Sequence, residues 1–243
     1  MFAYTRFEVR RTLRNPKFLL LVATVPVLLY VISVHNARDG STPLGASAAT
    51  WYLASAAVIG VLGGALTGAN ARVAAERASG WYRQLRTTPL GDGRWLVGRL
   101  LAGLAVVVPV VVLVAAVAIA WGGVRLAVTT WLALLVILVA GAVPAVLAGL
   151  ALGLALRSEA AQAAQAVVFV ALALFGGAFA DTEVPPSGTR FLVEAMPSYH
   201  LMALTREAVA GSALHVSHVA ALAAASIVLA VLVALLTRHA NHL

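Results

Sequence analysis

Long apolar runs separated by short polar segments dominate this chain. A helix that crosses a lipid bilayer needs about 20 consecutive, mostly apolar residues. The runs that approach or reach this length are Lys17–Val34, Trp51–Ala69, Leu100–Ala120, Trp131–Leu156, Ala161–Ala180 and Val219–Leu236. Pro26, Pro109 and Pro144 fall inside them, which a bilayer tolerates because neighbouring helices satisfy the freed carbonyl groups. The pattern predicts an all-α integral membrane protein with six transmembrane helices.

The first 16 residues have a different, amphipathic pattern. At 100° per residue, Phe2, Val9 and Leu13 share a narrow apolar stripe, and arginines recur every four residues beside it. Asn15–Pro16 then breaks the helix before the first apolar run. Residues 1–16 are therefore predicted to form an interfacial helix, and a disordered basic leader is the alternative.

A long polar segment, residues 181–214, precedes the last apolar run. It holds two short, moderately apolar pieces on either side of Pro197, and Ser198 can cap the second. Neither piece is long enough to span, and Arg206 and Glu207 would be costly in hydrocarbon. We expect short helices that lie at the outer leaflet or dip into it. Two ordinary surface helices fit the pattern equally well.

Composition and charge agree with a membrane protein. Apolar residues make up 62% of the chain and charged residues only 11%, against about 25% charged in soluble domains. With a cytoplasmic N-terminus, residues 1–17, 70–99, 157–160 and 237–243 face inward and hold 13 of the 17 basic residues, as the positive-inside rule requires. Anionic lipid and topology then explain the net charge of +8 without nucleic acid.

The same distribution predicts a multi-pass protein of a cell membrane with both termini in the cytoplasm. The chain is rich in Ala, Val, Leu, Gly and Arg, and Lys17 is its only lysine. This bias is typical of a GC-rich bacterial genome, so we expect the inner or plasma membrane of a bacterium.

Several kinds of chemistry have no support in the sequence. None of the six apolar interiors carries Asp, Glu, Lys, Arg or His, which argues against an ion-driven transporter and against acid–base catalysis within the membrane. The chain has no cysteine and no G-x-S-x-G nucleophile motif. It also lacks a P-loop, because Lys17 has no glycine-rich loop before it. Energy for uphill transport would have to come from another polypeptide.

Two groups of side chains outside the spans are candidates for sites. Ser198, Tyr199 and His200 are adjacent, but sequence neighbours rarely form a catalytic triad. His215 and His218 have a possible ligand spacing, yet no carboxylate accompanies them nearby in the sequence. We therefore interpret them as an interfacial pair, and we predict no catalytic, cofactor or metal site.

Small residues recur every four positions on two spans, which lets helix backbones approach closely. These residues are Gly60, Gly64 and Gly68 on the second span, and Gly141, Ala145, Gly149 and Gly153 on the fourth. They can face other spans of the same chain or a second subunit, and we favour contacts within the chain.

A basic segment, residues 71–101, lies between the second and third apolar runs and predicts a docking surface. It carries six arginines and only two acidic residues. Trp81, Tyr82 and Leu85 can act as apolar anchors with Arg83 and Arg86 at the rim. The alternative is that these arginines only bind anionic lipid headgroups.

This segment also carries a resemblance. It reads ERASGWYRQLRTTPLGDGRWLVGRLLAG, and its most specific positions are Glu76–Arg77, Gly80, Leu85, Thr88–Pro89–Leu90 and Gly98–Arg99–Leu100. With the N-terminal basic helix, the six spans and a second match at Met196–Pro197–Ser198–Tyr199, the chain resembles the permease subunit of type-2 ABC transporters. That group includes bacterial drug, polysaccharide and sodium exporters. Arg99 stands where the family usually has lysine.

The resemblance implies a partner and a mechanism. Two permease subunits, identical or different, would pair with two P-loop ATPase subunits that bind ATP and Mg²⁺, and alternating access would move the substrate outward. A coupling helix in the loop would rest in a groove of the ATPase. The residues of this coupling loop would be Glu76, Arg77, Gly80, Trp81, Tyr82, Arg83, Leu85, Arg86, Thr88, Pro89 and Leu90, and the outer segment would contribute Pro197, Ser198 and Tyr199.

Together these features predict a single transmembrane permease domain over residues 1–243. Its parts are 1–16 (interfacial helix), 17–69 (spans one and two), 70–99 (cytoplasmic coupling loop), 100–180 (spans three to five), 181–214 (extracellular segment) and 219–236 (span six). The few polar groups in the spans favour an amphipathic, hydrophobic or lipid-like substrate. A membrane-embedded enzyme and a non-transporting sensor or assembly partner are the alternatives.

Overall fold

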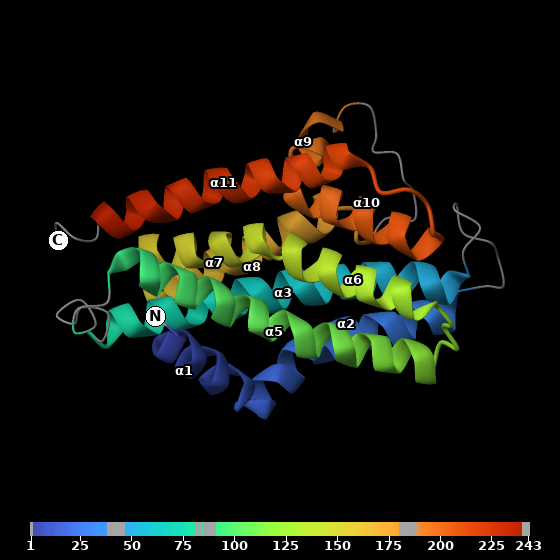
Figure 1. Ribbon diagram of the computed structural model, residues 1–243, viewed down its shortest axis with the longest axis horizontal. Coiled ribbons are helices and arrows are strands. Elements are labelled where there is room, and N and C mark those ends of the chain that lie inside the picture. Colours follow the sequence, from blue (N-terminus) through green and yellow to red (C-terminus); the bar gives the residue numbers. More distant parts are fainter. Residues whose placement is uncertain are drawn as a thin grey trace.

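The computed structural model describes residues 2–37, 47–80, 84, 91–179, 188 and 190–239. Its helices are α1 (Phe2–Leu13), α2 (Pro16–Asn36), α3 (Ala48–Ala78), α5 (Asp92–Ala120), α6 (Val128–Gly141), α7 (Val143–Ala155), α8 (Ser158–Phe175), α9 (Arg190–Glu194), α10 (Pro197–Ala210) and α11 (Val216–His239). They form an elongated bundle in which the long helices run along the same axis (Figure 1). Within the described residues, six helical stretches are long and apolar enough to cross a membrane. The predicted all-α membrane fold is confirmed.

Two spans are longer than their apolar runs. α3 continues from Ala69 to Ala78, and α5 begins at Asp92, before the apolar run at Leu100. Most of the predicted loop 70–99 is therefore helical, and the connection between α3 and α5 is only residues 79–91. Continued helix satisfies the backbone groups, and Arg72, Glu76, Arg77 and Arg99 find partners on other helices.

The fourth span is interrupted near its middle. α6 ends at Gly141 and α7 begins at Val143, with Ala142 between them and Pro144 in the first turn of α7. Pro144 has no N–H to donate to the preceding turn, so the regular ladder is broken there. The two helices still form one continuous apolar stretch, Val128–Ala155.

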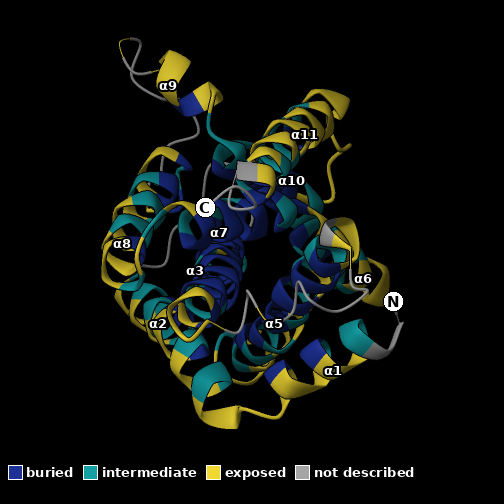
Figure 2. Ribbon diagram, turned by 90° about the vertical axis from the view of Figure 1, so that its left-hand side faces the viewer, coloured by how far each residue is buried: buried dark blue, intermediate teal, exposed yellow. Residues whose placement is uncertain are grey.

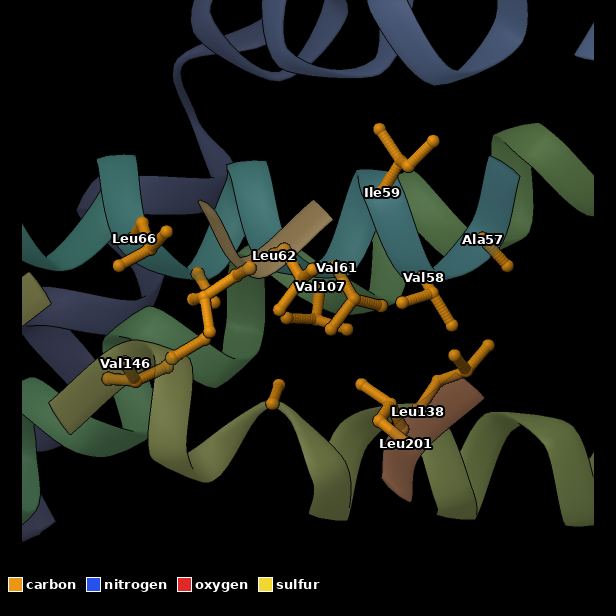
Figure 3. Close-up of a cluster of buried hydrophobic side chains, with 14 of the residues drawn as sticks. Ala57, Val58, Ile59, Val61, Leu62, Leu66, Val107, Leu138, Val146 and Leu201 are labelled. Atoms are coloured by element: carbon orange, nitrogen blue, oxygen red, sulfur yellow. The ribbon is translucent and has the colours of Figure 1, made fainter. Parts of the chain in front are cut away.

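α3 lies at the centre of the bundle. In its most apolar stretch 83% of residues are buried, against 17% in α2 and α8 and 11% in α11. Figure 2 shows α3 in dark blue inside a ring of helices whose outer faces are exposed. The ring carries exposed apolar side chains, such as Leu21 and Val167, which are compatible with contact to lipid. Figure 3 shows the core where Val61 and Leu62 of α3 lie near Val107 of α5.

The small-residue stripes face neighbours within the chain. A Cβ added at Gly60 would lie 2.8 Å from Val110 Cγ1 of α5, and one at Gly68 would lie 3.1 Å from Val106 Cγ2. On α7, a Cβ at Gly149 would lie 2.7 Å from the carbonyl oxygen of Leu66 in α3. The other stripe positions also have close or buried surroundings, namely Gly64, Gly141, Ala145 and Gly153. The glycines thus allow the backbone of α3 to pack closely against α5 and α7.

Of the two short helices in the outer segment, α10 enters the bundle. It packs against α3, α6 and α11, and Leu201, Met202 and Thr205 are buried. Leu201 fits against Gly141, where any side chain would collide with it. α9 is peripheral, with Val193 as its buried residue. A helix that dips into the bundle therefore describes α10 better than a surface helix does.

Candidate functional site: a buried charge cluster

Charged side chains from three helices meet at the end of the bundle where α1, the last turns of α3 and the first turns of α5 converge (Figure 1). We call this end of the molecule the charged end. The side chains are Glu8 and Arg11 of α1, Arg72 and Glu76 of α3, and Arg99 of α5, and together we call them the charge cluster. Helices far apart in the sequence are thereby joined at one point.

Arg99 is the centre of the charge cluster. Its side chain is 2% exposed. One terminal nitrogen, Nη1, donates to Glu8 Oε2 at 3.0 Å, and the other, Nη2, donates to both carboxylate oxygens of Glu76. A planar guanidinium suits this double engagement because its donors form a fixed fork. Removing either carboxylate would leave a buried charge poorly compensated.

Two further arginines surround the carboxylates. Arg72 Nη1 lies 3.8 Å from Glu8 Oε2 and donates a hydrogen bond to Thr12 Oγ1. Arg11 Nη1 lies 3.8 Å from Glu76 Oε1, and its side chain is 55% exposed. Three arginines and two glutamates give the charge cluster one excess positive charge. The Arg11 edge opens to solvent, while the Arg99 centre is closed.

Local sequence spacing explains how the charge cluster assembles. Arg72 and Glu76 are four residues apart, so they share one face of α3. Gly98 comes directly before Arg99 and lets α1 approach, because a Cβ there would lie 2.7 Å from Tyr4 Cε1. Burial raises the pKa of the Tyr4 hydroxyl to about 12, so the ring stays neutral beside the charges at physiological pH.

Arg77 ties α3 to a fourth helix. Its Nη1 donates to the carbonyl oxygens of Gly153 (3.1 Å) and Leu156 (3.2 Å), at the end of α7. A cation there satisfies open carbonyls and complements the helix dipole. Gly80 follows in a turn with φ of +74°, and among the described residues no other group lies within 4 Å of where its Cβ would be.

These positions change the interpretation of the predicted coupling residues. Glu76 and Arg77 bind groups of their own chain, so Glu76 in particular is not free to meet a partner protein. Gly80 lies at the start of the connection between α3 and α5. The remaining predicted coupling residues lie outside the described residues, and they are Trp81, Tyr82, Arg83, Leu85, Arg86, Thr88, Pro89 and Leu90.

Sequence reasoning missed three members of the charge cluster, Glu8, Arg11 and Arg72, and also the neighbouring Thr12. One signal was available, because Glu8 is the single acidic residue among residues 1–17. A lone carboxylate in a basic segment is a candidate for pairing across helices. The distance of 91 positions between Glu8 and Arg99 hid the partner.

A neutral polar cluster inside the spans was also missed. Asn70 Nδ2 donates to the carbonyl oxygen of Ala161 (2.9 Å) and to Gln165 Oε1 (2.8 Å). Gln165 Nε2 in turn donates to Thr67 Oγ1 at 2.9 Å. These bonds fasten α8 to α3 without any formal charge.

The predicted outer residues lie at the start of α10. Pro197 begins the helix, and Ser198 is buried. Tyr199 makes an edge contact with His200, with ring centroids 5.3 Å apart. Both ring nitrogens of His200 contact groups other than Ser198. These neighbours in the sequence therefore do not assemble a serine–histidine pair.

Two of the cavities among the described helices bear on function. One, of about 640 Å³, lies beside the charge cluster and is lined by Phe7, Phe18 and Arg72 among others. The second, of about 200 Å³, lies within the bundle between α3, α7, α8, α10 and α11. Its lining is apolar apart from Ser198. The first is amphipathic in character and the second is suited to an apolar group.

Comparisons with known proteins agree on one kind of molecule. The profile of the family described as "ABC-2 type transporter" matches residues 1–210. A similar protein of Bacillus subtilis (strain 168), "Putative transport permease YvfS", is 27% identical over 193 residues. That alignment covers 79% of this chain and 78% of the relative.

Proposed function

This chain belongs to the ABC-2 type transporter family, and from that premise we propose that it is the membrane permease subunit of an exporter powered by a separate ATPase. The chain supplies no P-loop lysine of its own, since Lys17 follows Asn15–Pro16 rather than a glycine-rich loop. ATP and Mg²⁺ would therefore bind to the partner, and this chain would act as a transport subunit without enzymatic activity.

The charge cluster is the observation that carries the proposal. Residues 79–91 connect α3 to α5. Glu76 lies in the last turn of α3 and Arg99 lies about two turns into α5, and those two side chains bind each other. Arg99 also holds Glu8, so α1 joins the same unit. A force applied by an ATPase to the connection would move the ends of all three helices together. A network of packed and hydrogen-bonded side chains of this kind can carry coupling over a distance.

The connection itself would be the docking element. Trp81, Tyr82 and Leu85 would enter a groove of the ATPase, and Arg83 and Arg86 would contact its rim. Two permease chains and two ATPase chains would complete the transporter. The charged end would face the cytoplasm of a bacterial cell, together with both termini, because 13 of the 17 basic residues would then lie inside.

We propose an amphipathic or hydrophobic substrate that moves outward. The bundle contains a largely apolar cavity of about 200 Å³, and its buried polar groups are few. A hydrophobic tail would be compatible with this lining, whereas a sugar polymer would leave many hydroxyl groups unpaired.

Co-purification tests the proposal. The tagged chain is isolated in mild detergent from its native cells, and its partners are identified and quantified by mass spectrometry. We expect a P-loop ATPase in about equal amount. A Trp81→Ala, Leu85→Ala double variant should lose ATPase-driven transport, whereas the control Trp121→Ala, an exposed residue at the opposite end, should not. A preparation without ATPase, from cells that express one, would overturn the permease assignment.

A further inference from the structure

A group of histidines lies where α10 is followed by α11. The structure brings a carboxylate to the pair that the sequence showed alone: Glu207, His215 and His218 each place one ligand atom within 4.8 Å of the others. Glu207 comes from the last turn of α10, His215 from the connection, and His218 from the first turn of α11. We call these three side chains the histidine–glutamate site.

Glu207 contacts both histidines of this site. Glu207 Oε1 lies 2.6 Å from His215 Nδ1 and 3.7 Å from His218 Nε2. The second oxygen, Oε2, accepts the backbone N–H of His215 at 3.0 Å, which orients the carboxylate. The separation of 3.7 Å is too long for a direct hydrogen bond, so Glu207 and His218 face each other without one.

The neighbouring His200 determines which ring nitrogen of His218 donates a hydrogen bond. His200 Nε2 lies 2.9 Å from the carbonyl oxygen of Glu194, which can only accept, so Nε2 carries the hydrogen. In a neutral ring His200 Nδ1 is then an acceptor, and it lies 2.8 Å from His218 Nδ1. His218 then donates from Nδ1, so in a neutral His218 ring the lone pair is on Nε2, which lies 3.7 Å from Glu207 Oε1.

Two acceptors that face each other call for a cation between them. We propose that the histidine–glutamate site binds a divalent transition-metal ion of the Zn²⁺ class through Glu207, His215 and His218. Two imidazoles and one carboxylate are a ligand set that Zn²⁺ accepts, with a fourth position for water. Bonds of about 2.0–2.2 Å set ligand atoms roughly 3.3 Å apart in a tetrahedron. Binding would therefore bring Glu207 Oε1 and His218 Nε2 slightly closer than their present 3.7 Å, and would move His215 Nδ1 away from its present 2.6 Å contact with the carboxylate.

The surroundings support the same chemistry. His200 and Glu194 would form the outer hydrogen-bond chain that orients a metal-bound imidazole. Glu207 and His218 are mostly buried, at 14% and 19% exposed, whereas His215 is 70% exposed and offers an entry side. The bound ion would fasten the end of α10 to the start of α11. His215 would give up its Nδ1 proton to solvent on binding.

Direct metal binding to the purified full chain tests this site. The probe is Zn²⁺ alone, titrated by calorimetry onto protein that carries a tag without histidine, and Co²⁺ absorption reports the geometry. We expect one ion per chain. His218→Ala and Glu207→Gln should each weaken binding by at least about tenfold, and His200→Ala by about 10–100-fold. His35→Ala is the matched control, because His35 is an exposed histidine on α2, and it should bind as the parent does.

The outcomes separate the explanations. Elution volume in size-exclusion chromatography shows whether each variant is folded, and Glu207→Gln keeps the size of the side chain if an alanine variant is unstable. Zn²⁺ should also raise the melting temperature of the parent but not of Glu207→Gln. Equal Zn²⁺ affinity in the parent, Glu207→Gln and His218→Ala would overturn the proposal. So would a site that responds to pH through His218 but binds no metal, because the cation would then be a proton.

Discussion

Arg99 holds two carboxylates from different helices on one guanidinium. Its environment is closed, so the charges of Glu8 and Glu76 are balanced by the protein rather than by water. Such a buried arrangement adds little net stability while it is complete, but it is costly to break. The identity of the central residue therefore matters more than the number of ion pairs.

Arg99→Ala should destabilise the protein by about 3–5 kcal/mol, because Glu8 and Glu76 would remain buried and close together without their cation. Arg99→Lys should cost less, since it keeps the charge and loses only the fork geometry. Thermal unfolding in detergent measures both. Arg94→Ala is the control, because Arg94 is exposed near the start of the same helix and should be neutral. Equal melting temperatures for all three variants would contradict a structural role of the charge cluster.

Tyr4 gives the charged end a pH dependence at high pH. Burial raises its pKa from 10 to about 12, so the folded protein keeps the hydroxyl proton that the unfolded chain loses. The contribution of Tyr4 to stability is thus complete below pH 10 and is lost as the pH rises toward 12. The difference in tyrosinate absorbance between the parent and Tyr4→Phe should have a midpoint near 12. A midpoint near 10 would show that Tyr4 is exposed to water.

At the scale of the elements, small residues set how closely α3, α5 and α7 pack. The carbonyl oxygen of Leu66 lies 2.7 Å from the place that the Cβ of a residue at position 149 would take. Backbone cannot move aside as a flexible side chain can, so the helices themselves would have to separate. The stripe on α7 is therefore a packing requirement between two particular helices.

Gly149→Ala should lower stability by about 1–3 kcal/mol, as overpacking of a filled interior does. Gly93→Ala is the matched control, because no group of the part of the chain that the structure describes lies within 4 Å of its Cβ position in α5. Alanine favours helix over glycine, so this control should be neutral or slightly stabilising. Melting temperatures in the same detergent compare the two. A larger loss for Gly93→Ala than for Gly149→Ala would contradict the proposed contact.

At the scale of the whole molecule, the two ends of the bundle differ in their number of basic residues. α1, the end of α3 and the start of α5 lie at one end, while the connection between α10 and α11 lies at the other (Figure 1). The basic residues gather at the first end, which is the distribution that the positive-inside rule assigns to the cytoplasm. The expected orientation across the membrane therefore depends on basic residues of several helices rather than on those of one helix.

Single-cysteine labelling measures this orientation, and the natural chain has no cysteine to interfere. Ser79→Cys lies at the charged end and Ser212→Cys at the opposite end, and both positions are exposed. In intact cells, a membrane-impermeant maleimide should label Ser212→Cys and leave Ser79→Cys unlabelled until the cells are opened. The reverse pattern would place the charged end outside and exclude docking of a cytoplasmic ATPase on it.

The sequence by itself determined the number of spans, their approximate positions and the basic asymmetry. The length of each apolar run and the charges beside it carry that information, because whether a segment spans a bilayer depends mainly on that segment itself. The tertiary structure decided which polar residues meet. Glu8 and Arg99 are 91 positions apart, and Glu207 reaches the pair His215 and His218 only because α10 turns back beside α11. Periodicity reports neighbours within a few residues, whereas such pairs exist only after the helices have packed.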